Sequence, residues 1–419
     1  MPRPFLKIVA ASLRHWSLLL LLPWPLLAQA GEISRLEELR RKHPADAIVL
    51  YNLAALRAAS GDSAATLELL EAVSRAPGGL DPGVYGGFRF LHGDSRFQQL
   101  VARIRAENPP MVRSRTAFTI PERDLHPEGM AWDPVTRSIF SGSFKGKIIR
   151  VDAQGAASDF AWVLEPGAPH RVVVGIRVDS ARGHLWAAVE DPRAFGEPTL
   201  AGSALHQYEI HTGRLLARYA GPGFGALNDV AVAPSGEAFA TNSSDGSIWR
   251  AVPGQAAMDE FLPAGSVPEA NGITFSADGT LLFVAGWHDI ARVELRTHAL
   301  LALPAPPGVT TGNLDGLYYH RGTLVGIQNG VHPGRVVRFR LDAEGRSITG
   351  AEVLERYHPL HNGVATGALD GDSFLYFVNT QSRSFHADGT PINPATLSET
   401  VIVRLPLDGP AAAGNPRSP

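Results

Sequence analysis

One pattern recurs six times in the second part of the chain, and it constrains the fold more than any other feature. In five of the six copies the first residue is polar, and glycine usually follows it. Each copy then continues with an alternating apolar strand, a turn and a second strand. The six copies start at Glu128, Val174, Asn228, Asn271, Asp315 and Asn362. Their spacing of about 43 to 54 residues matches the roughly 40 to 50 residues of a four-stranded propeller blade. The sequence therefore predicts a six-bladed β-propeller.

The last copy lacks an obvious outermost strand. The apolar and β-branched segment 115–120, which precedes the first copy, could supply that strand and close the ring. A (β/α)₈ barrel is unlike this pattern because no helical segment intervenes between the strands. We expect an all-β propeller over residues 111–408, followed by a disordered tail over 409–419.

The region before the propeller has helical spacing of its apolar residues. The run from Ile48 to Leu56 is broken by Gly61-Asp62 and resumes with Leu67, Leu69 and Leu70. Asp94 is placed to cap a further helix, and Asn108-Pro109-Pro110 ends it. We expect a helical region over residues 31–110.

This helical region resembles a tetratricopeptide unit over about one and a half repeats, in the wording Tyr51-Asn52-Leu53-Ala54-Ala55 and Leu69-Leu70-Glu71-Ala72. Such repeats usually need about three copies to expose a binding groove. Two interpretations stay open: a small helical cap packed on the propeller, and a module that binds a protein partner.

The N-terminus has the features of an export signal. Arg3, Lys7 and Arg14 precede an apolar run over 16–27, and Ala28-Gln29-Ala30 has the small residues of a cleavage site. The pattern predicts a signal peptide over residues 1–30 and a periplasmic or secreted protein, with an uncleaved anchor as the alternative. No later segment is long and apolar enough to span a membrane, so no span is expected once the signal is removed.

Charge and cysteine content exclude several classes of partner and site. The formal net charge is -3, and the basic residues are scattered, which argues against nucleic acid as a partner. The chain has no cysteine, so disulfides, thiolate metal sites and a cysteine nucleophile are excluded. Any metal must be held by oxygen or nitrogen.

The polar residues at the repeat starts predict a metal site. The innermost strand of each blade lines the central channel, so its first residue lies at one mouth of that channel, and equivalent positions converge. The polar members are Glu128, Asn228, Asn271, Asp315 and Asn362. Such oxygen donors suit a hard divalent cation, with Ca²⁺ first and Mg²⁺, Mn²⁺ or Zn²⁺ as alternatives. The competing interpretation is that Asn-Gly and Asp-Gly are merely turn dipeptides.

The same residues carry a family resemblance. The motifs are Glu128-Gly129-Met130-Ala131-Trp132-Asp133, Asn228-Asp229, Asn271-Gly272-Ile273-Thr274-Phe275-Ser276 and Asp315-Gly316-Leu317. They resemble those of the senescence marker protein (regucalcin)/gluconolactonase family. The resemblance implies a metal-dependent hydrolase of a lactone or related ester, in which Glu128, Asn271 and Asp315 bind the metal and Asn228 completes the site or touches substrate.

Two further points follow from the resemblance. It implies that Asp315 is the general base, but a carboxylate bound to a metal is a weakened base. His126, His170 and His361, near the starts of inner strands, are therefore rivals. Asn362 and His126 are also candidates for an extra ligand or a substrate contact. The family's gluconolactonases have an arginine at the position of Ala226, so the expected substrate is not a gluconolactone.

Two other functions stay open from the sequence. The chain could be a non-catalytic propeller, a ligand sensor or interaction scaffold in which the metal is structural. A metal-free propeller similar to strictosidine synthase fits less well, because so many oxygen-bearing residues are aligned.

Overall fold

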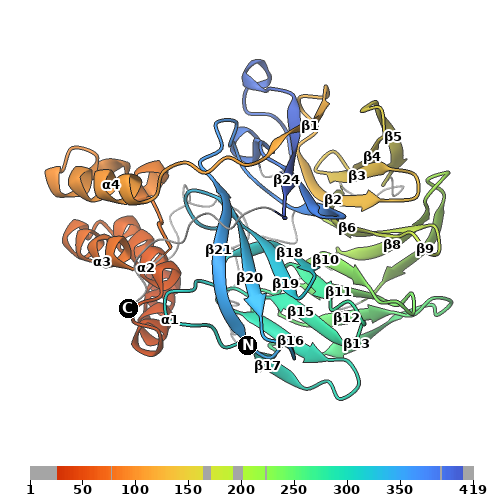
Figure 1. The fold of residues 1–419 in the computed structure, drawn as a ribbon, viewed down its shortest axis with the longest axis horizontal. Coiled ribbons are helices and arrows are strands. Elements are labelled where there is room, and N and C mark those ends of the chain that lie inside the picture. The colour runs from red at the N-terminus through yellow and green to blue at the C-terminus, as the bar shows by residue number, and fades with distance from the viewer. Residues whose placement is uncertain are drawn as a thin grey trace, which may run out of the picture.

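The fold is a six-bladed β-propeller with a group of helices at its N-terminal end, as the repeat predicts (Figure 1). The computed structural model describes residues 26–76, 78–163, 171–191, 202–221, 224–386 and 389–408. Six sheets of four strands each make up the propeller, and each is antiparallel. Residues 1–25, most of the predicted signal peptide, and the predicted tail 409–419 lie outside the described residues.

The blades follow one another along the chain. Blade one consists of β2 (Pro127–Asp133), β3 (Ser138–Ser143), β4 (Lys147–Val151) and β5 (Ala157–Trp162). Blade two consists of β6 (Val172–Asp179), β7 (His184–Glu190), β8 (Ala204–Glu209) and β9 (Leu215–Ala220). Blade three consists of β10 (Leu227–Val232), β11 (Ala238–Asn242), β12 (Ile248–Ala251) and β13 (Met258–Leu262).

The remaining three blades complete the ring. Blade four consists of β14 (Ile273–Phe275), β15 (Leu281–Ala285), β16 (Ile290–Glu294) and β17 (Leu300–Ala302). Blade five consists of β18 (Leu314–His320), β19 (Thr323–Gln328), β20 (Arg335–Leu341) and β21 (Ile348–Arg356). Blade six consists of β22 (Gly367–Asp370), β23 (Ser373–Phe377), β24 (Thr400–Pro406) and β1 (Arg115–Ile120), with the short 3₁₀ helices η4 (Ser382–Ser384) and η5 (Pro394–Thr396) between β23 and β24.

The ring closes with strands from both ends of the propeller sequence. β1 pairs antiparallel with β24, from Arg115 opposite Arg404 to Ile120 opposite Thr400. Figure 1 shows these two strands side by side. The expectation that residues 115–120 supply the missing outer strand is therefore confirmed, and the closed ring removes two sheet edges.

The core of the propeller lies between the blades. Among the described residues, six clusters of buried apolar side chains each join one blade to the next. Trp186 of blade two packs with Ala238 of blade three, for example, and Ile139 of blade one packs with Leu375 of blade six. Strands buried on both faces explain the nearly continuous apolar runs of the sequence.

The N-terminal helices are α1 (Leu26–Lys42), α2 (Ala47–Ala59), α3 (Ser63–Arg75), η1 (Pro82–Val84), η2 (Gly86–Leu91) and α4 (Ser95–Glu107), which we call the helical unit. The boundary of the predicted signal peptide, residue 30, falls inside α1. Asp46, Asp62 and Asp94 cap α2, α3 and α4 by accepting hydrogen bonds from backbone N–H groups of the first turn. Within the described residues no helix combines the length and the apolar character needed to cross a membrane.

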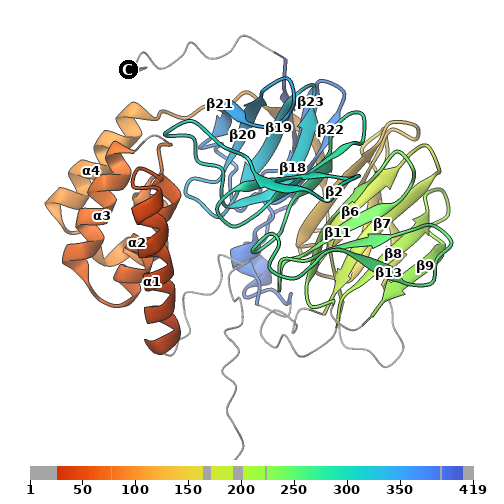
Figure 2. The same ribbon diagram turned by 90° about the horizontal axis from the view of Figure 1, so that it is seen from below.

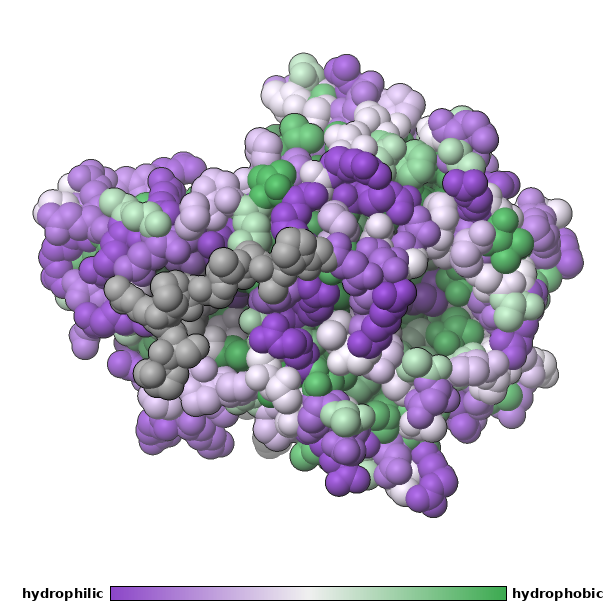
Figure 3. Space-filling model, in the orientation of Figure 1, coloured by the Kyte–Doolittle hydropathy of each residue, from purple (hydrophilic) through white to green (hydrophobic). Residues whose placement is uncertain are grey.

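The helical unit packs against blades four and five (Figures 1 and 2). Asp46 lies 2.9 Å from His288 in the β15–β16 loop, and Tyr51 stacks on His332 in the β19–β20 loop. These loops join second strands to third strands, so they lie at the strand ends where the inner strands begin. The helical unit therefore flanks the mouth of the channel at which the predicted ligands converge. Its surface is predominantly hydrophilic in Figure 3.

Candidate metal centre at the channel mouth

A local irregularity places the predicted ligands at the mouth. In blades one, two, three and five the pairing of the inner strand with the second strand shifts at the repeat start. In blade one, for example, Pro127 pairs with Ser143 but Met130 pairs with Ser141, so Glu128 and Gly129 form a bulge. Bulges re-aim side chains and are common beside active sites. Asn271 of blade four has the same place, with its N–H bonded to Ala285.

The glycine that follows the ring residue has a packing role. A Cβ atom at Gly129 would lie 2.2 Å from the carbonyl oxygen of Val174, and one at Gly175 would lie 2.2 Å from that of Asn228. Inner strands of neighbouring blades thus approach so closely that only glycine fits. The glycines after Glu128, Val174 and Asn271 are explained by such contacts with the next blade, whereas blade three has Asp229 at this position and a Cβ at Gly316 would meet the side chain of Tyr318 in its own strand.

The pairing of the inner strand with the second strand shows that five of the six repeat starts occupy equivalent positions. The sixth, Asn362, does not. In blade six Gly367 pairs with Tyr376, which makes Ala365 the counterpart of Glu128. Asn362 lies three residues earlier, with its side chain exposed. Gly363 has φ 82, so Asn362-Gly363 is a turn dipeptide. The alignment of Asn362 with the ring is therefore wrong, and the mouth ring consists of Glu128, Val174, Asn228, Asn271, Asp315 and Ala365.

The two carboxylates of the mouth ring are buried. Glu128 and Asp315 are 7% and 8% exposed. Burial raises the pKa of Glu128 well above its usual value, and the charges of Asp315 and Glu190 raise it further. Burial and then Asp229 raise the pKa of Asp315 to about 6, against hydrogen bonds from Asn329 and Asn271 that lower it. Neither carboxylate forms an ion pair with any lysine or arginine of the described ranges.

The two amides of the mouth ring differ in their contacts. Asn228 donates a 3.0 Å hydrogen bond to the hydroxyl of Ser243. The Oδ1 atom of Asn271 is buried and has no hydrogen-bond partner among the described residues. An unpaired buried acceptor is costly, so this oxygen is available to a donor or a cation.

A second tier of residues supports the ring, and it adds one residue that the sequence did not suggest. On each second strand, one position lies three residues after the partner of the first inner-strand residue that pairs beyond the bulge. It is Ser243 in blade three and Asn329 in blade five, and these contact Asn228 and Asp315. The same position in blade two is Glu190, which is fully buried and has no hydrogen-bond partner for either oxygen among the described residues. Burial raises its pKa well above the usual value.

Three histidines were rival candidates for the general base. His126 is buried between the rings of Phe144 and Phe385, at centroid distances of 4.1 and 4.3 Å. Neither of its nitrogens has a partner in the described part of the chain, and burial lowers its pKa to about 3. The two flanking rings hold His126 as a packed aromatic side chain.

Of the other two histidines, the structure describes only His361. His361 lines a small pocket between blades five and six with Arg335, Glu355 and Tyr376, and burial lowers its pKa to about 4. His170 lies outside the described residues.

The donor set fits a hard cation held partly by amides. No group of three or more His, Asp or Glu side chains in the described ranges is arranged to hold a metal ion. A cation at the mouth would depend on the oxygens of Asn228 and Asn271 as well as on Glu128 and Asp315. Two buried carboxylates without a cationic partner and the unpaired Asn271 Oδ1 are consistent with such a cation.

Comparisons with known proteins show the fold and no more. No protein-family model matches the chain, and no curated protein matches it. Among solved structures, the major allergen Mala s 1 of Malassezia sympodialis is similar at 14% identity and a TM-score of 0.54, over 72% of this chain and 99% of that one.

Two weaker structural likenesses involve enzymes. A PQQ-bound aldose sugar dehydrogenase from Streptomyces coelicolor matches at 15% identity and a TM-score of 0.49, over 70% of this chain and 97% of that one. A candidate gluconolactonase matches at 14% identity and a TM-score of 0.46, over 72% of this chain and 95% of that one. At these levels of similarity the function must be argued from the mouth ring itself.

Proposed function

We propose that this chain is a divalent-cation-dependent hydrolase of a lactone or a related ester, with Ca²⁺ as the first choice of cation. The observation that supports it most is the mouth ring, in which two buried carboxylates and two amides from four blades occupy equivalent bulge positions. The resemblance of these motifs to the regucalcin/gluconolactonase family supports the same class of reaction.

The proposed ligands are Glu128, Asn228, Asn271 and Asp315. A divalent cation bound there would polarise the substrate carbonyl and favour the negative charge that develops on its oxygen. The two carboxylates would balance its charge, and the unpaired Oδ1 of Asn271 would gain a partner. Carboxylate and amide oxygens favour Ca²⁺, Mg²⁺ or Mn²⁺ over Zn²⁺, which usually recruits His or Cys.

Asp315 is the proposed base. Its carboxylate would accept a proton from the attacking water while the oxygen of that water bonds to the acyl carbon. The bond between the acyl carbon and the ring oxygen then breaks, and the proton passes to the leaving oxygen to give a hydroxy acid. Asn329 and Asn271 hold the Asp315 carboxylate by hydrogen bonds, which fixes its orientation.

The substrate is proposed to be other than a sugar lactone. Ala226 is buried, its N–H donates a 3.0 Å hydrogen bond to Asn242, and its methyl side chain offers no group to grip a hydroxyl. The position therefore lacks the arginine of the gluconolactonases, and an apolar or aromatic lactone is the better candidate.

The test is proton release from a panel of aromatic, aliphatic and sugar lactones, with chelator and with added Ca²⁺. We expect Ca²⁺-dependent turnover that Glu128→Gln and Asp315→Asn each lower by about 100-fold or more. The matched control is Glu260→Gln, which changes an exposed carboxylate of β13 and should leave the rate unchanged. Unchanged turnover in either mouth-ring variant contradicts the proposal, and Ca²⁺-dependent melting without hydrolysis of any lactone would favour a structural metal in a scaffold.

A further inference from the structure

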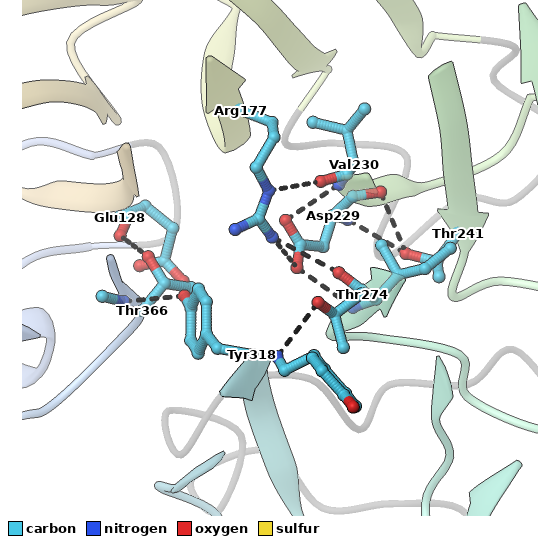
Figure 4. A network of polar contacts seen from close by, with 11 residues as sticks. Glu128, Arg177, Asp229, Val230, Thr241, Thr274, Tyr318 and Thr366 are labelled. Atoms are coloured by element: carbon cyan, nitrogen blue, oxygen red, sulfur yellow. Dashed lines mark hydrogen bonds and ion pairs between the residues drawn. The ribbon is translucent and has the colours of Figure 1, made fainter. Parts of the chain in front are cut away.

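A polar network lies one layer below the mouth ring, and Arg177 is at its centre (Figure 4). Arg177 is on the inner strand of blade two, three residues after Val174, so its Cα lies roughly 10 Å further along the strand. Its side chain is 20% exposed and points across the axis toward the other blades. No role for this arginine follows from the sequence motifs.

The guanidinium contacts three other inner strands. Its Nε donates to the carbonyl oxygen of Val230 over 2.9 Å, and its Nη2 donates to that of Ile273 over 3.3 Å. Nη2 also lies 3.4 Å from Oδ2 of Asp229. The guanidinium lies over the ring of Tyr318 at 5.2 Å, a distance suited to cation–π attraction. Blade two is thereby joined to blades three, four and five.

The partners of Arg177 sit next to the proposed ligands in the sequence. Asp229 follows Asn228 directly, Ile273 is two residues after Asn271, and Tyr318 is three residues after Asp315. Asp229 also accepts a 3.2 Å hydrogen bond from the N–H of Ile273. Any movement of Arg177 would therefore reach three of the four strands that carry proposed ligands.

The remaining strands of the ring are tied into the same layer. The hydroxyl of Tyr318 accepts a 2.8 Å hydrogen bond from Gly367 of blade six. Thr366 of blade six donates a 2.7 Å hydrogen bond to the carbonyl oxygen of Glu128 in blade one. Through Tyr318 the network reaches every blade.

We infer that Arg177 is a positioning residue for the cation site, which sets the distances between the strands that carry Asn228, Asn271 and Asp315. This inference rests on the proposed function, in that it takes the mouth ring to bind a cation. Arg177 bridges three backbone or side-chain oxygens at once, which its planar guanidinium can do and a lysine ammonium cannot do in the same geometry. Partners behind a metal ligand typically change metal affinity by about 10- to 100-fold when they are removed.

The experiment measures Ca²⁺ affinity by titration calorimetry on the full chain, without substrate. We expect Arg177→Met to weaken Ca²⁺ binding by about 10- to 100-fold, and Arg177→Lys, which keeps the charge, to fall between Arg177→Met and the wild type. The matched control is Arg182→Met. Arg182 also bridges blades two and three, by a 2.7 Å hydrogen bond to Pro234, but at the opposite ends of the strands. Its loss should lower the melting temperature and leave Ca²⁺ affinity unchanged.

A double variant distinguishes the positioning role of Arg177 from its role in balancing the charge of Asp229. It also provides a variant that is expected to fold. Arg177→Met leaves Asp229 buried without its cation and can unfold the protein, whereas Arg177→Met with Asp229→Asn removes both charges. We expect the double variant to fold, as judged by circular dichroism, and still to bind Ca²⁺ at least about 10-fold more weakly than the wild type.

The outcomes are distinct. Wild-type affinity in Arg177→Met or in the double variant overturns the role of Arg177 and leaves the proposed function standing, as does an equal loss in Arg182→Met. Absence of Ca²⁺ binding by the wild-type protein contradicts the proposed cation site and the role of Arg177 together.

Discussion

The side-chain amide of Asn329 lies 2.5 Å from Oδ2 of Asp315 and 3.2 Å from the carbonyl oxygen of Val364. Asn329 therefore holds the proposed base and joins blade five to blade six. Asn379 has the same position in blade six, where the mouth-ring residue is Ala365, and it bonds to Ser398 and Glu399 instead.

This pair gives a matched prediction. We expect Asn329→Ala to weaken Ca²⁺ binding and lower lactone turnover by about 10-fold, because the Asp315 carboxylate loses a donor that orients it. Asn379→Ala should lower the melting temperature without changing either property. Calorimetric titration and proton release measure both variants, and equal effects on Ca²⁺ binding in the two would contradict a specific role for Asn329.

A second prediction concerns the contact between the helical unit and the propeller. Tyr51 is 3% exposed and packs against Phe88 and His332, but its hydroxyl has no hydrogen-bond partner among the described residues. We expect Tyr51→Phe to keep or raise the free energy of unfolding by up to about 1 kcal/mol. Tyr51→Ala should lower it by about 3 to 5 kcal/mol, because a large buried ring is lost.

The control for Tyr51 is a tyrosine whose hydroxyl is bonded. Tyr357 donates a 2.9 Å hydrogen bond to the buried carboxylate of Asp81, so Tyr357→Phe should cost about 1 to 3 kcal/mol. Denaturant unfolding measures all three variants. A larger loss in Tyr51→Phe than in Tyr357→Phe would contradict the prediction.

A third prediction concerns acid stability and His332. Burial, with help from the charge of Arg383, lowers the pKa of His332 to about 3, and its Nε2 lies 2.7 Å from the Arg383 guanidinium. In the unfolded chain the imidazole of His332 binds a proton below about pH 6.5, whereas in the folded chain it stays neutral down to about pH 3. The stability that this histidine contributes at neutral pH is therefore lost as pH falls from about 6.5 toward 3.

The change that tests it is His332→Gln, which keeps an acceptor for Arg383. We expect its free energy of unfolding to fall less steeply below pH 6.5 than that of the wild type, by about 1.4 kcal/mol per pH unit. His386 is exposed, so His386→Gln should keep the wild-type slope. Unfolding curves between pH 4 and 7 give the slopes, and equal slopes for His332→Gln and wild type would refute the argument.

A fourth prediction concerns Glu190, for which stability is lost as pH rises and not as pH falls. Its pKa is raised by burial, so the stability it contributes is present below the unfolded pKa of about 4.3 and is lost as pH rises through the folded value. With chelator present, Glu190→Gln should be more stable than the wild type at pH 8, and the difference should shrink toward pH 4. A difference that is the same at both pH values would show that the carboxyl charge is not the cause.

The repeat and its strand pattern were enough to predict the fold, because each blade repeats the same order of apolar strands separated by turns, although the turns differ in length. The glycine that follows four of the six ring residues was visible in the sequence, but its packing role was not. The 2.2 Å approach that a Cβ at Gly129 would make to Val174 exists only once neighbouring blades are packed.

The wrong alignment of Asn362 and the omission of Glu190 and Arg177 also arise from contacts that exist only in the folded propeller. Asn362-Gly363 matches the motif in letters, yet strand pairing in blade six begins the equivalent segment at Ala365. Glu190 and Arg177 lie at strand positions where the sequence shows only a polar residue in an alternating pattern. Their importance depends on contacts between blades, which no local pattern encodes.

Ring closure has a consequence for the order in which the protein is built. β24 lies between β1 and β23, so the strand made first in the propeller must wait for the strand made last. Pairing across so long a stretch of chain is slow, and unpaired edges invite aggregation while they persist. A nascent chain halted before Thr400 would thus expose two strand edges, and release of the last few dozen residues would set the time at which the ring locks.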